Sequence, residues 1–510
     1  MQTIRFQGLV HLREQILNSP LDEYVAVILD DREIDFDSNY LHRLTDVASD
    51  IDATITYCYY RERLPDGSLK NHPVIDYQPG SIRDDFNFGP VVLLNASDVI
   101  ATTESISEES IADIPVEAQW YILRLEISSG KVIAMVPEYL YTARACDLRK
   151  SGDRQHDYVK AERELLQRHY QEIFTTYLKS RNGLVNPERE DVDYDSEAFP
   201  VEASVIIPVR NRARTILDAV ESALSQKTDF SFNVIVVDND STDGTREKLE
   251  AASALDPRLV VVKVSADENL GIGGCWNKAL LSPECGRFAV QLDSDDIYNS
   301  NDTLRKIIDK FRSGNYAMVV GSYTLVDFDG KRLLAEDITH SEWSDDNGPN
   351  NALRVNGFGA PRAFFTPVAR QFLFPNVSYG EDYAMALRIS RTYRIGRIYE
   401  SLYLCRRWEG NSDADLSVEK ENEHNYYKDC VRSIEIIARV RENHERRKEN
   451  GPTWQEMLFG PNGIQSVFDN LSQDDEEEED DDELNLGFSD DDDEEEFNDE
   501  DEGFDGDDSL

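Results

Sequence analysis

The sequence predicts an α/β protein whose main domain lies in the second half of the chain, and three observations support this class. Over residues 200–415, short apolar runs alternate with charged helical stretches, the pattern of a mainly parallel sheet with crossover helices. Hydrophobic residues make up 40% of the 510 residues, enough for cores in two to four domains. Asp residues also stand at the ends of two predicted strands, the sheet edge where such folds bind ligands.

The elements of this main domain follow from the apolar runs and from their helix signals. Buried strands are expected at 203–209, 232–238, 259–264 and 288–293. Helices are expected at 212–226, after Asp243, at 301–313 and at 381–391. Asp238 and the carboxylates at 293–296 are therefore expected to meet at one edge of the sheet.

Composition divides the chain into five segments. The first is a strand-and-helix module, and the second is a helix that ends at Gly183 and continues into an acidic linker. The main domain is followed by a charged helical extension and by an acidic tail that is expected to be disordered. The boundaries are 1–150, 151–199, 200–415, 416–472 and 473–510.

The net charge of −48 limits the partners that the protein can bind. Residues 474–510 hold 24 acidic and no basic residues, so half of the net charge is local to the tail. Such a tail cannot bury enough apolar surface to fold, and we expect it to serve solubility, with binding of a basic partner as the alternative. No basic stripe is visible, which argues against nucleic-acid binding.

The cysteine pattern and the hydropathy predict a cytoplasmic location. None of the six cysteines is at C-x-x-C spacing, which favours reduced thiols. The N-terminus has no basic region followed by an apolar region, so no signal peptide is expected. No apolar run approaches 18 residues, so no transmembrane segment is expected.

The segment LDSDD at 292–296 carries the strongest chemical signal. Carboxylates this close repel one another, and a hard cation such as Mn²⁺ or Mg²⁺ would relieve the repulsion. An acidic loop that caps the next helix is the alternative. The Gly-rich segment 270–280 is weak evidence for a phosphate site, because glycines also serve tight turns, and it matches neither a P-loop nor a dinucleotide fingerprint.

The order of the motifs is more specific than any single motif. IIPVRNR, VVDNDSTDGT, NLGIGGCWN, LDSDD and GEDYAMALRIS follow one another with a spacing that resembles the family-2 glycosyltransferases of GT-A fold. The resemblance covers about 200–415, and VEASVIIPVRNR and YLCRRWEGNSD are especially similar to gut-bacterial members. It implies an inverting, metal-dependent transfer from a nucleotide-sugar, with UDP-sugars slightly favoured, to a glycan or other hydroxyl acceptor.

The resemblance also assigns roles to residues of this chain. Asp295 matches the usual metal ligand and Asp293 its partner that reaches the ribose, while Asp382 matches the general base and Glu381 its neighbour. The remaining matches, which hold the nucleobase, ribose or pyrophosphate, are Pro208, Val209, Arg210, Asp238, Asn269, Gly271, Arg406, Arg407 and Trp408.

One position departs from the family pattern. Many relatives have a metal-binding His where this chain has Trp408. Either the metal has fewer protein ligands here, or Arg407 neutralises the pyrophosphate. His340 is a third possibility, although a lone His is more often structural.

The N-terminal segment echoes the main domain and resembles a truncated GT-A-like module. Four short segments recur in the same order, and alignment on Arg124 and Arg388 places Ala118 opposite Asp382. Only about 24 residues precede the strand that ends at Asp30 and Asp31, so the nucleobase-binding strands are expected to be absent. We expect an inactive module with a structural or acceptor-presenting role.

Two other functions remain open on the sequence. A binding or scaffold protein would keep nucleotide-sugar recognition without transfer, and Trp408 favours it whereas Asp382 and LDSDD oppose it. A sugar nucleotidyltransferase would need a Gly-rich basic loop after the first strand, and the segment PVRNRART at 208–215 has no glycine.

Overall fold

A computed structural model gives the fold of the chain. It describes residues 3–18, 23–104, 106, 108–151, 163–341, 347–408, 410–411, 415–447 and 453–459. The predicted acidic tail at 473–510 lies outside the described residues.

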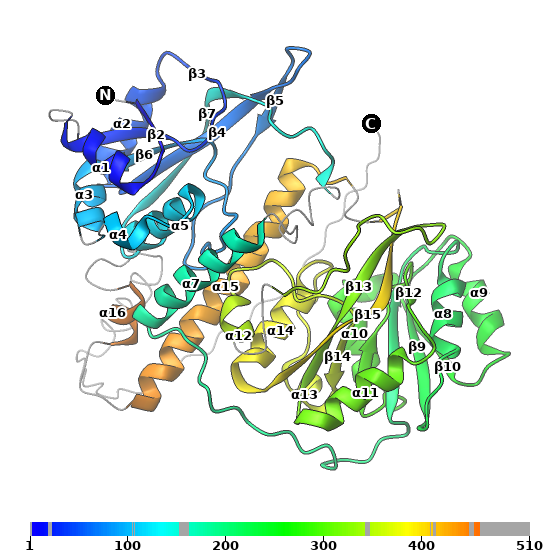
Figure 1. The fold of residues 1–510 in the computed structure, drawn as a ribbon. Coiled ribbons are helices and arrows are strands. Elements are labelled where there is room, and N and C mark those ends of the chain that lie inside the picture. Colours follow the sequence, from blue (N-terminus) through cyan, green and yellow to red (C-terminus); the bar gives the residue numbers. More distant parts are fainter. Residues whose placement is uncertain are drawn as a thin grey trace, which may run out of the picture. The chain divides into compact units, whose positions relative to one another are not determined.

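The main domain is built on one eight-stranded sheet, which confirms the predicted α/β class (Figure 1). The strand order is β10-β9-β8-β11-β14-β13-β15-β12. The strands are β8 (Ala203–Val209), β9 (Phe232–Asn239), β10 (Leu259–Val264), β11 (Phe288–Gln291), β12 (Ile297–Tyr298), β13 (Met318–Asp327), β14 (Arg362–Phe365) and β15 (Ile395–Arg407).

Four neighbouring strands of this sheet, β10, β9, β8 and β11, are parallel. Two of the predicted strands, 203–209 and 259–264, match the structure at both ends. The predicted strand 288–293 ends earlier, at Gln291, because the chain turns at 292–296 and Asp296 donates its N–H to the Asp293 carbonyl. The helices are α8 (Ile216–Leu224), α9 (Thr245–Ser253), η3 (Ala266–Glu268), α10 (Ile272–Leu280), α11 (Thr303–Gly314), α12 (Gly348–Asn351), α13 (Thr366–Phe372) and α14 (Glu381–Thr392).

The N-terminal segment forms a second, seven-stranded sheet with the order β1-β2-β6-β4-β7-β3, and β5 pairs with β4. Its strands are β1 (Thr3–Arg5), β2 (Tyr24–Ile28), β3 (Ile34–Phe36), β4 (Ile55–Arg63), β5 (Leu69–His72), β6 (Val91–Asn95) and β7 (Ile133–Arg144). Its helices are α1 (Leu9–Leu17), α2 (Tyr40–Asp50), α3 (Ala96–Glu104), α4 (Glu108–Ile111) and α5 (Val116–Ile127).

The two sheets share one topology over six strands. The order β1-β2-β6-β4-β7-β3 corresponds to β8-β11-β14-β13-β15-β12, and each of the five pairings has the same direction in both sheets. The long parallel pairs β4–β7 and β13–β15 are even interrupted by register shifts at similar points. One expectation is corrected, because β1 occupies the place of β8. Its three residues are too short to show an apolar pattern, and only the places of β9 and β10 are empty among the described strands.

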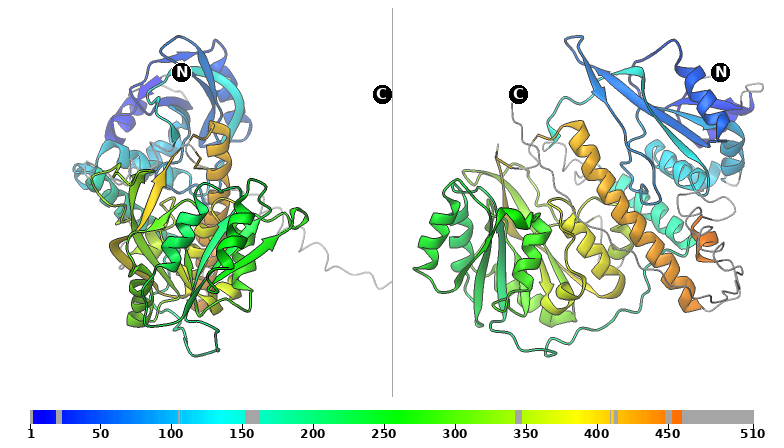
Figure 2. Two further views of the ribbon diagram at one scale, coloured as in Figure 1. Left: turned by 90° about the vertical axis from the view of Figure 1, so that its right-hand side faces the viewer. Right: turned by 180° about the vertical axis from the view of Figure 1, so that it is seen from behind.

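Three further helices complete the described chain. They are α7 (Glu164–Ser180), α15 (Val418–Arg447) and α16 (Trp454–Phe459). The long helix α15 packs on α14 and α16 and runs across the molecule as the orange helix in Figure 2. Some of its charged side chains are buried. The Asp429 carboxylate forms ion pairs with Arg432 of the same helix, at 2.8 Å, and with Arg83 of the N-terminal segment, at 3.1 Å.

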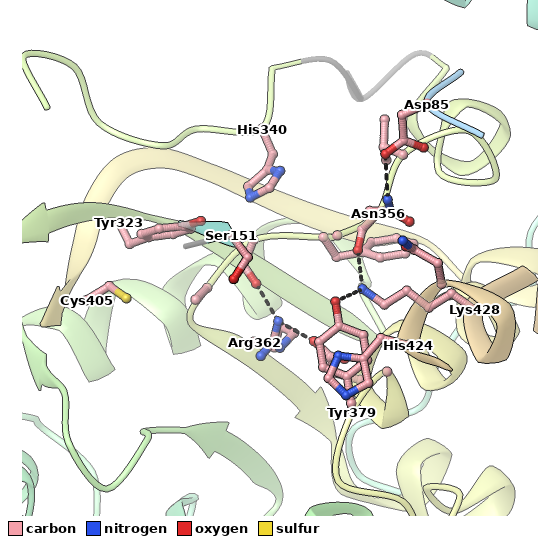
Figure 3. Close-up of a pocket in the computed structure, with 18 of the residues that line it drawn as sticks. Asp85, Ser151, Tyr323, His340, Asn356, Arg362, Tyr379, Cys405, His424 and Lys428 are labelled. Atoms are coloured by element: carbon pink, nitrogen blue, oxygen red, sulfur yellow. Dashed lines mark hydrogen bonds and ion pairs between the residues drawn. The ribbon is translucent and has the colours of Figure 1, made fainter. Parts of the chain in front are cut away.

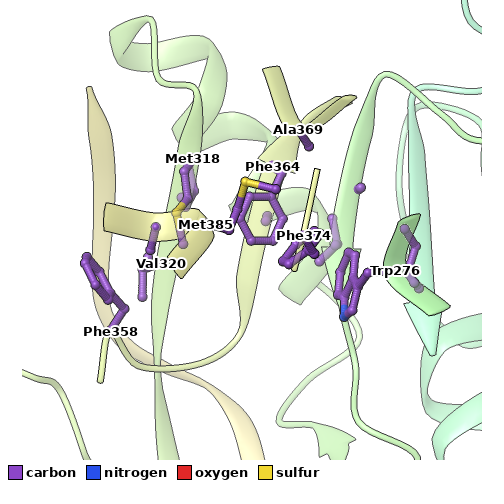
Figure 4. Packing of buried hydrophobic residues seen from close by; sticks show 14 of the residues in the cluster. Trp276, Met318, Val320, Phe358, Phe364, Ala369, Phe374 and Met385 are labelled. Carbon is purple, nitrogen blue, oxygen red and sulfur yellow. The ribbon is translucent and has the colours of Figure 1, made fainter. Parts of the chain in front are cut away.

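Each sheet has its own hydrophobic core. In the main domain, part of this core lies between the sheet and its helices (Figure 4). It includes Trp276 of α10, Phe364 of β14, Phe374 of the segment between α13 and α14, and Met385 of α14. The ring centroids of Trp276 and Phe364 are 5.7 Å apart. This packing fixes the start of α14 relative to the sheet edge. Among the described helices, none combines the length and the apolar character needed to cross a membrane.

Candidate active site

A cavity of about 750 Å³ opens where the turn after β11, the end of β15 and the start of α14 meet (Figure 3). It is lined by five of the predicted site residues or their neighbours, which are Asp293, Asp296, Glu381, Asp382 and Arg407. The volume is within the range of pockets that bind small molecules. The structure thus brings the LDSDD segment and the Glu–Asp pair into one site.

Asp293 lines this cavity and is held by two hydrogen bonds. Its carboxylate accepts from the side-chain amide of Gln291 at 2.9 Å, and its N–H donates to the Tyr403 hydroxyl at 3.0 Å. Burial raises the pKa of Asp293, against the lowering effect of the Arg362 guanidinium. A cation would therefore find a desolvated carboxylate that gains from being neutralised.

The next two carboxylates of the turn point in different directions. Asp296 is buried and accepts the N–H of Arg406 at 2.7 Å, and burial raises its pKa well above the ordinary value. Asp295 instead accepts from the Trp408 indole N–H at 3.4 Å and from the Asn411 amide at 3.2 Å. Asp295 therefore lies beside the indole that replaces the family's histidine.

Glu381 and Asp382 begin α14 at the cavity wall. The Asp382 carboxylate pairs with the Arg362 guanidinium at 2.5 Å. Burial raises the pKa of Asp382, but Arg362, Lys428 and backbone N–H groups outweigh it, so the pKa is lowered overall. Burial, together with the charge of Asp382, raises the pKa of Glu381 to about 8. The two pKa shifts run in opposite directions, which favours a proton on Glu381 and a negative charge on Asp382.

The three residues at the end of β15 separate in space. Arg407 lines the cavity. Arg406 is buried and pairs with Asp218 of α8 at 2.8 Å, so its guanidinium holds the LDSDD turn rather than facing the cavity. Its Nε also donates to the Asp295 carbonyl. Trp408 lies against Asp295, and Arg214 stacks over its ring at 5.0 Å.

The residues expected to bind the nucleobase lie on the neighbouring strands. Val209 ends β8 opposite Asp238 of β9, beside Pro208, while Arg210 is exposed just beyond the strand. Asp238 is buried and pairs with Arg246 at 2.5 Å. None of these residues lines the cavity described above. They lie at or just beyond the ends of β8 and β9.

Asn269 and Gly271 are held by a contact that the sequence did not reveal. The Asn376 side chain accepts the N–H of Gly271 at 2.7 Å and donates to the Asn269 carbonyl at 3.2 Å. A Cβ on Gly273 would overlap the carbonyl oxygen of Pro375. The close approach of α10 to the segment before α14 is thus enough to explain the glycines. This is the structural alternative to a phosphate site in a Gly-rich segment.

A divalent cation fits this site only if the substrate supplies part of its shell. Among the described residues, no group of three or more His, Cys, Asp or Glu side chains could hold a metal alone. Mg²⁺ and similar ions often use one or two carboxylates together with phosphate oxygens and water. Of the two predicted metal ligands, Asp293 lines the cavity, whereas Asp295 is not in the lining and its carboxylate accepts from Trp408 and Asn411. His340 lines the cavity near Tyr323, with 6.0 Å between the rings.

Four further residues at this site were missed from the sequence. Arg362 follows a Gly-Ala-Pro loop and looked like an ordinary strand residue, and Lys428 looked like one charge among many on α15. Asn411 lies three residues after the family's expected histidine position, and Asp85 belongs to the N-terminal segment. Only contacts between distant segments reveal these roles.

Comparison with known proteins places the main domain. Residues 204–362 match the family model described as glycosyl transferase family 2. The putative teichuronic acid biosynthesis glycosyltransferase TuaG of Bacillus subtilis is 37% identical over 130 residues, which are 26% of this chain and 50% of TuaG. The chain therefore spans only half the length of that relative. The glucosyltransferase WfgD of Escherichia coli is 28% identical over 248 residues, 47% of this chain and 87% of WfgD.

Solved structures include more distant matches. The structure of S. aureus TarS residues 1–349 in complex with UDP-GlcNAc has 20% identity and a TM-score of 0.36, covering 51% of this chain and 70% of that chain. The resemblance that the ordered motifs predict is confirmed by the match of the family model. The chain therefore carries, at residues 204–362, a domain of glycosyl transferase family 2.

Proposed function

We propose that this protein is an inverting glycosyltransferase that moves a sugar from a nucleotide diphosphate to a hydroxyl group of an acceptor. The observation that carries the proposal is the single cavity shared by Asp293 of the LDSDD turn and by Asp382 of α14. The family match supports the sugar-transfer chemistry. The donor would lie along the ends of β8, β9 and β11, with its sugar at Asp293 and the acceptor beside Asp382.

Asp382 is the proposed general base. The acceptor hydroxyl must lose its proton as its oxygen attacks the anomeric carbon, and an ionised carboxylate at the cavity wall can accept it. The lowered pKa of Asp382 keeps it ionised at neutral pH, whereas Glu381, with a pKa of about 8, stays mostly protonated. A single displacement of this kind inverts the anomeric centre.

The departing diphosphate needs positive charge around it. Arg407 lines the cavity and is the proposed cationic side chain for this role. Asp293 and Asp295 would hold a divalent cation, Mn²⁺ or Mg²⁺, which when bound supplies further neutralisation of the leaving group. The buried Arg406 would keep the turn that carries both carboxylates in place.

The N-terminal module is proposed to be a non-catalytic copy of the same fold. Its sheet shares six strands with the main domain, and α5 carries Ala118 at the place of Asp382. Arg32 pairs with Asp30 at 2.7 Å, so an arginine already neutralises the carboxylate that corresponds to the LDSDD turn. The absence of strands at the places of β9 and β10 among the described residues also fits loss of nucleotide binding.

A thermal-shift screen of nucleoside diphosphates and their sugars, with and without Mn²⁺, tests the proposal. We expect at least one nucleotide, with UDP first, to raise the unfolding midpoint, and the metal to increase the effect. Asp295→Asn should reduce this shift, whereas Asp309→Asn on the exposed face of α11 should leave it unchanged. If no nucleotide stabilises the protein even with metal, the proposal fails. If a nucleotide binds but its sugar is never released, the binding-protein alternative suggested by Trp408 replaces it.

A further inference from the structure

We infer that the N-terminal module builds the acceptor subsite, and that the acceptor is a neutral glycan whose hydroxyl groups bind Asp85 and Asn356. This inference rests on the proposed transferase function. It starts from the extent of the cavity, which reaches from Asp293 and Asp382 to Asp84 and Asp85 of the N-terminal module. A non-catalytic copy that only stabilised the fold would not need to line the site.

A chain of hydrogen bonds runs along one wall of this cavity, from Asp85 to Tyr379 (Figure 3). The Asn356 side-chain amide donates to Asp85 at 3.0 Å. The Lys428 ammonium donates to the Asn356 carbonyl at 2.6 Å and to the Tyr379 hydroxyl at 3.2 Å. Lys428 also lowers the pKa of Asp382. The wall therefore runs from the N-terminal module to the proposed base.

The turn that carries Asp85 is anchored rigidly. Arg83 pairs with Asp85 at 2.6 Å and with the buried Asp429 of α15 at 3.1 Å. The N–H of Gly80 donates to Ser433 at 2.8 Å, and a Cβ on Gly80 would overlap the backbone of α15. The Arg83–Asp429 pair is buried, and moving the turn away would leave its charges buried without partners, which opposes such a movement. The module is held where its carboxylates complete the cavity.

The chemistry of the wall favours hydroxyl groups over anions. Two cations at this end have partners, since Arg354 pairs with Asp84 and Lys428 donates to the Asn356 carbonyl and the Tyr379 hydroxyl, whereas Arg163 is an exposed arginine of the same lining. Asp85 remains half-exposed and, after accepting from Arg83 and Asn356, keeps lone pairs for further donors. A phosphorylated or carboxylated acceptor bound at Asp85 would meet this carboxylate directly, and the repulsion favours a neutral hydroxyl donor there.

Aromatic rings supply flat apolar surface for sugar rings in the same cavity. Tyr379 and His424 are stacked, with 3.7 Å between ring centroids and 9° between planes. Pockets for small ligands combine such surfaces with a few placed polar groups. Besides Tyr379 and His424, the aromatic residues of the lining are Tyr170, Tyr323, His340, Phe358 and Tyr403.

The test is calorimetric titration of the full chain, loaded with UDP and Mn²⁺, with cellobiose, chitobiose and maltotriose as neutral probes and glycerol 3-phosphate as the anionic probe. We expect at least one neutral probe to bind and glycerol 3-phosphate not to bind. Asp85→Asn and, from the other side of the wall, Asn356→Ser should each weaken the neutral probe about tenfold or more. The matched control Asp113→Asn, an exposed Asp of the same module, should change its affinity less than twofold.

The outcomes separate this inference from the proposed function. If UDP itself does not bind, the transferase proposal fails. If UDP binds but no neutral probe does, or if glycerol 3-phosphate binds instead, the glycan inference is overturned while the donor site stands. Equal affinities in the wild type, Asp85→Asn and Asn356→Ser would show that the N-terminal module is not part of the subsite.

Discussion

Arg362 and Asp382 form an ion pair of 2.5 Å inside the wall of the cavity. The same guanidinium opposes the rise that burial causes in the pKa of Asp293. Burial lowers the pKa of Arg362, but the charges of Asp382, Asp293 and Glu381 outweigh this and raise it. One partly buried cation thus acts electrostatically on both the proposed base and the donor-side carboxylate.

Replacing Arg362 should move the pH profile of transfer. Arg362 is the largest of the effects that lower the pKa of Asp382, so Arg362→Gln should raise that pKa. Because Asp382 must be ionised to accept a proton, the acidic limb of kcat/KM should shift to higher pH, by roughly one to three units. Kinetics between pH 4 and 9 measure the shift.

The matched control is Arg312→Gln, at the exposed end of α11. It removes the same charge without touching the cavity and should leave the acidic limb in place. An Arg362→Gln enzyme with a lower rate but an unmoved profile would show that Arg362 does not control ionisation of the base.

Glu381 should make the folded protein less stable at alkaline pH. Its pKa is about 8 in the folded state, above the ordinary value of 4.5, so the folded state holds the proton over a range where the unfolded state has lost it. Stability therefore falls as pH rises from 4.5 towards 8. Glu381→Gln removes this loss and should melt at a higher temperature than wild type at pH 9, with a smaller difference at pH 5. Parallel melting curves across this range would contradict the assignment.

Gly273 should not tolerate a methyl group. Because its Cβ would overlap the Pro375 carbonyl, Gly273→Ala has to separate α10 from the segment before α14, at a cost of roughly 1–3 kcal/mol in unfolding free energy. Gly357→Ala is the control, since its Cβ would meet only a ring carbon of His340 at an ordinary 3.7 Å. Urea unfolding of both variants measures the difference. Equal stability would place the glycines' role elsewhere, such as phosphate contact.

Much of the sheet could be predicted because its strands are dominated by apolar residues, in the buried β8 as in the partly buried edge strand β10. The runs 203–209 and 259–264 are continuous apolar stretches, and both gave the observed strands. The predicted helix 212–226 was too long, since the loop before α8 is held by Ser241 and Thr245, which accept the N–H groups of Asn211 and Arg212. Such side-chain contacts between loops leave no periodic signal.

The candidate site was predictable only in part. Motif order identified Asp293 and Asp382, which line one cavity. Arg362 could not be found in this way, because its role depends on two carboxylates that are distant in the sequence. The roles of the charged residues of α15 could not be predicted either, because Asp429 pairs with Arg83, a residue 346 positions away in the sequence. Electrostatic partners across segments are set by tertiary packing.

The most direct test of the account is sugar transfer by Asp382→Asn, compared with wild type under saturating nucleotide-sugar and Mn²⁺. The amide cannot accept the proton, so kcat should fall by roughly 10²–10⁴-fold. The affinity for UDP, measured by calorimetry on the same preparations, should stay within twofold, because the proposed role of Asp382 is towards the acceptor and not the nucleotide. Transfer at the wild-type rate by Asp382→Asn would contradict the assignment of the base and with it the proposed mechanism.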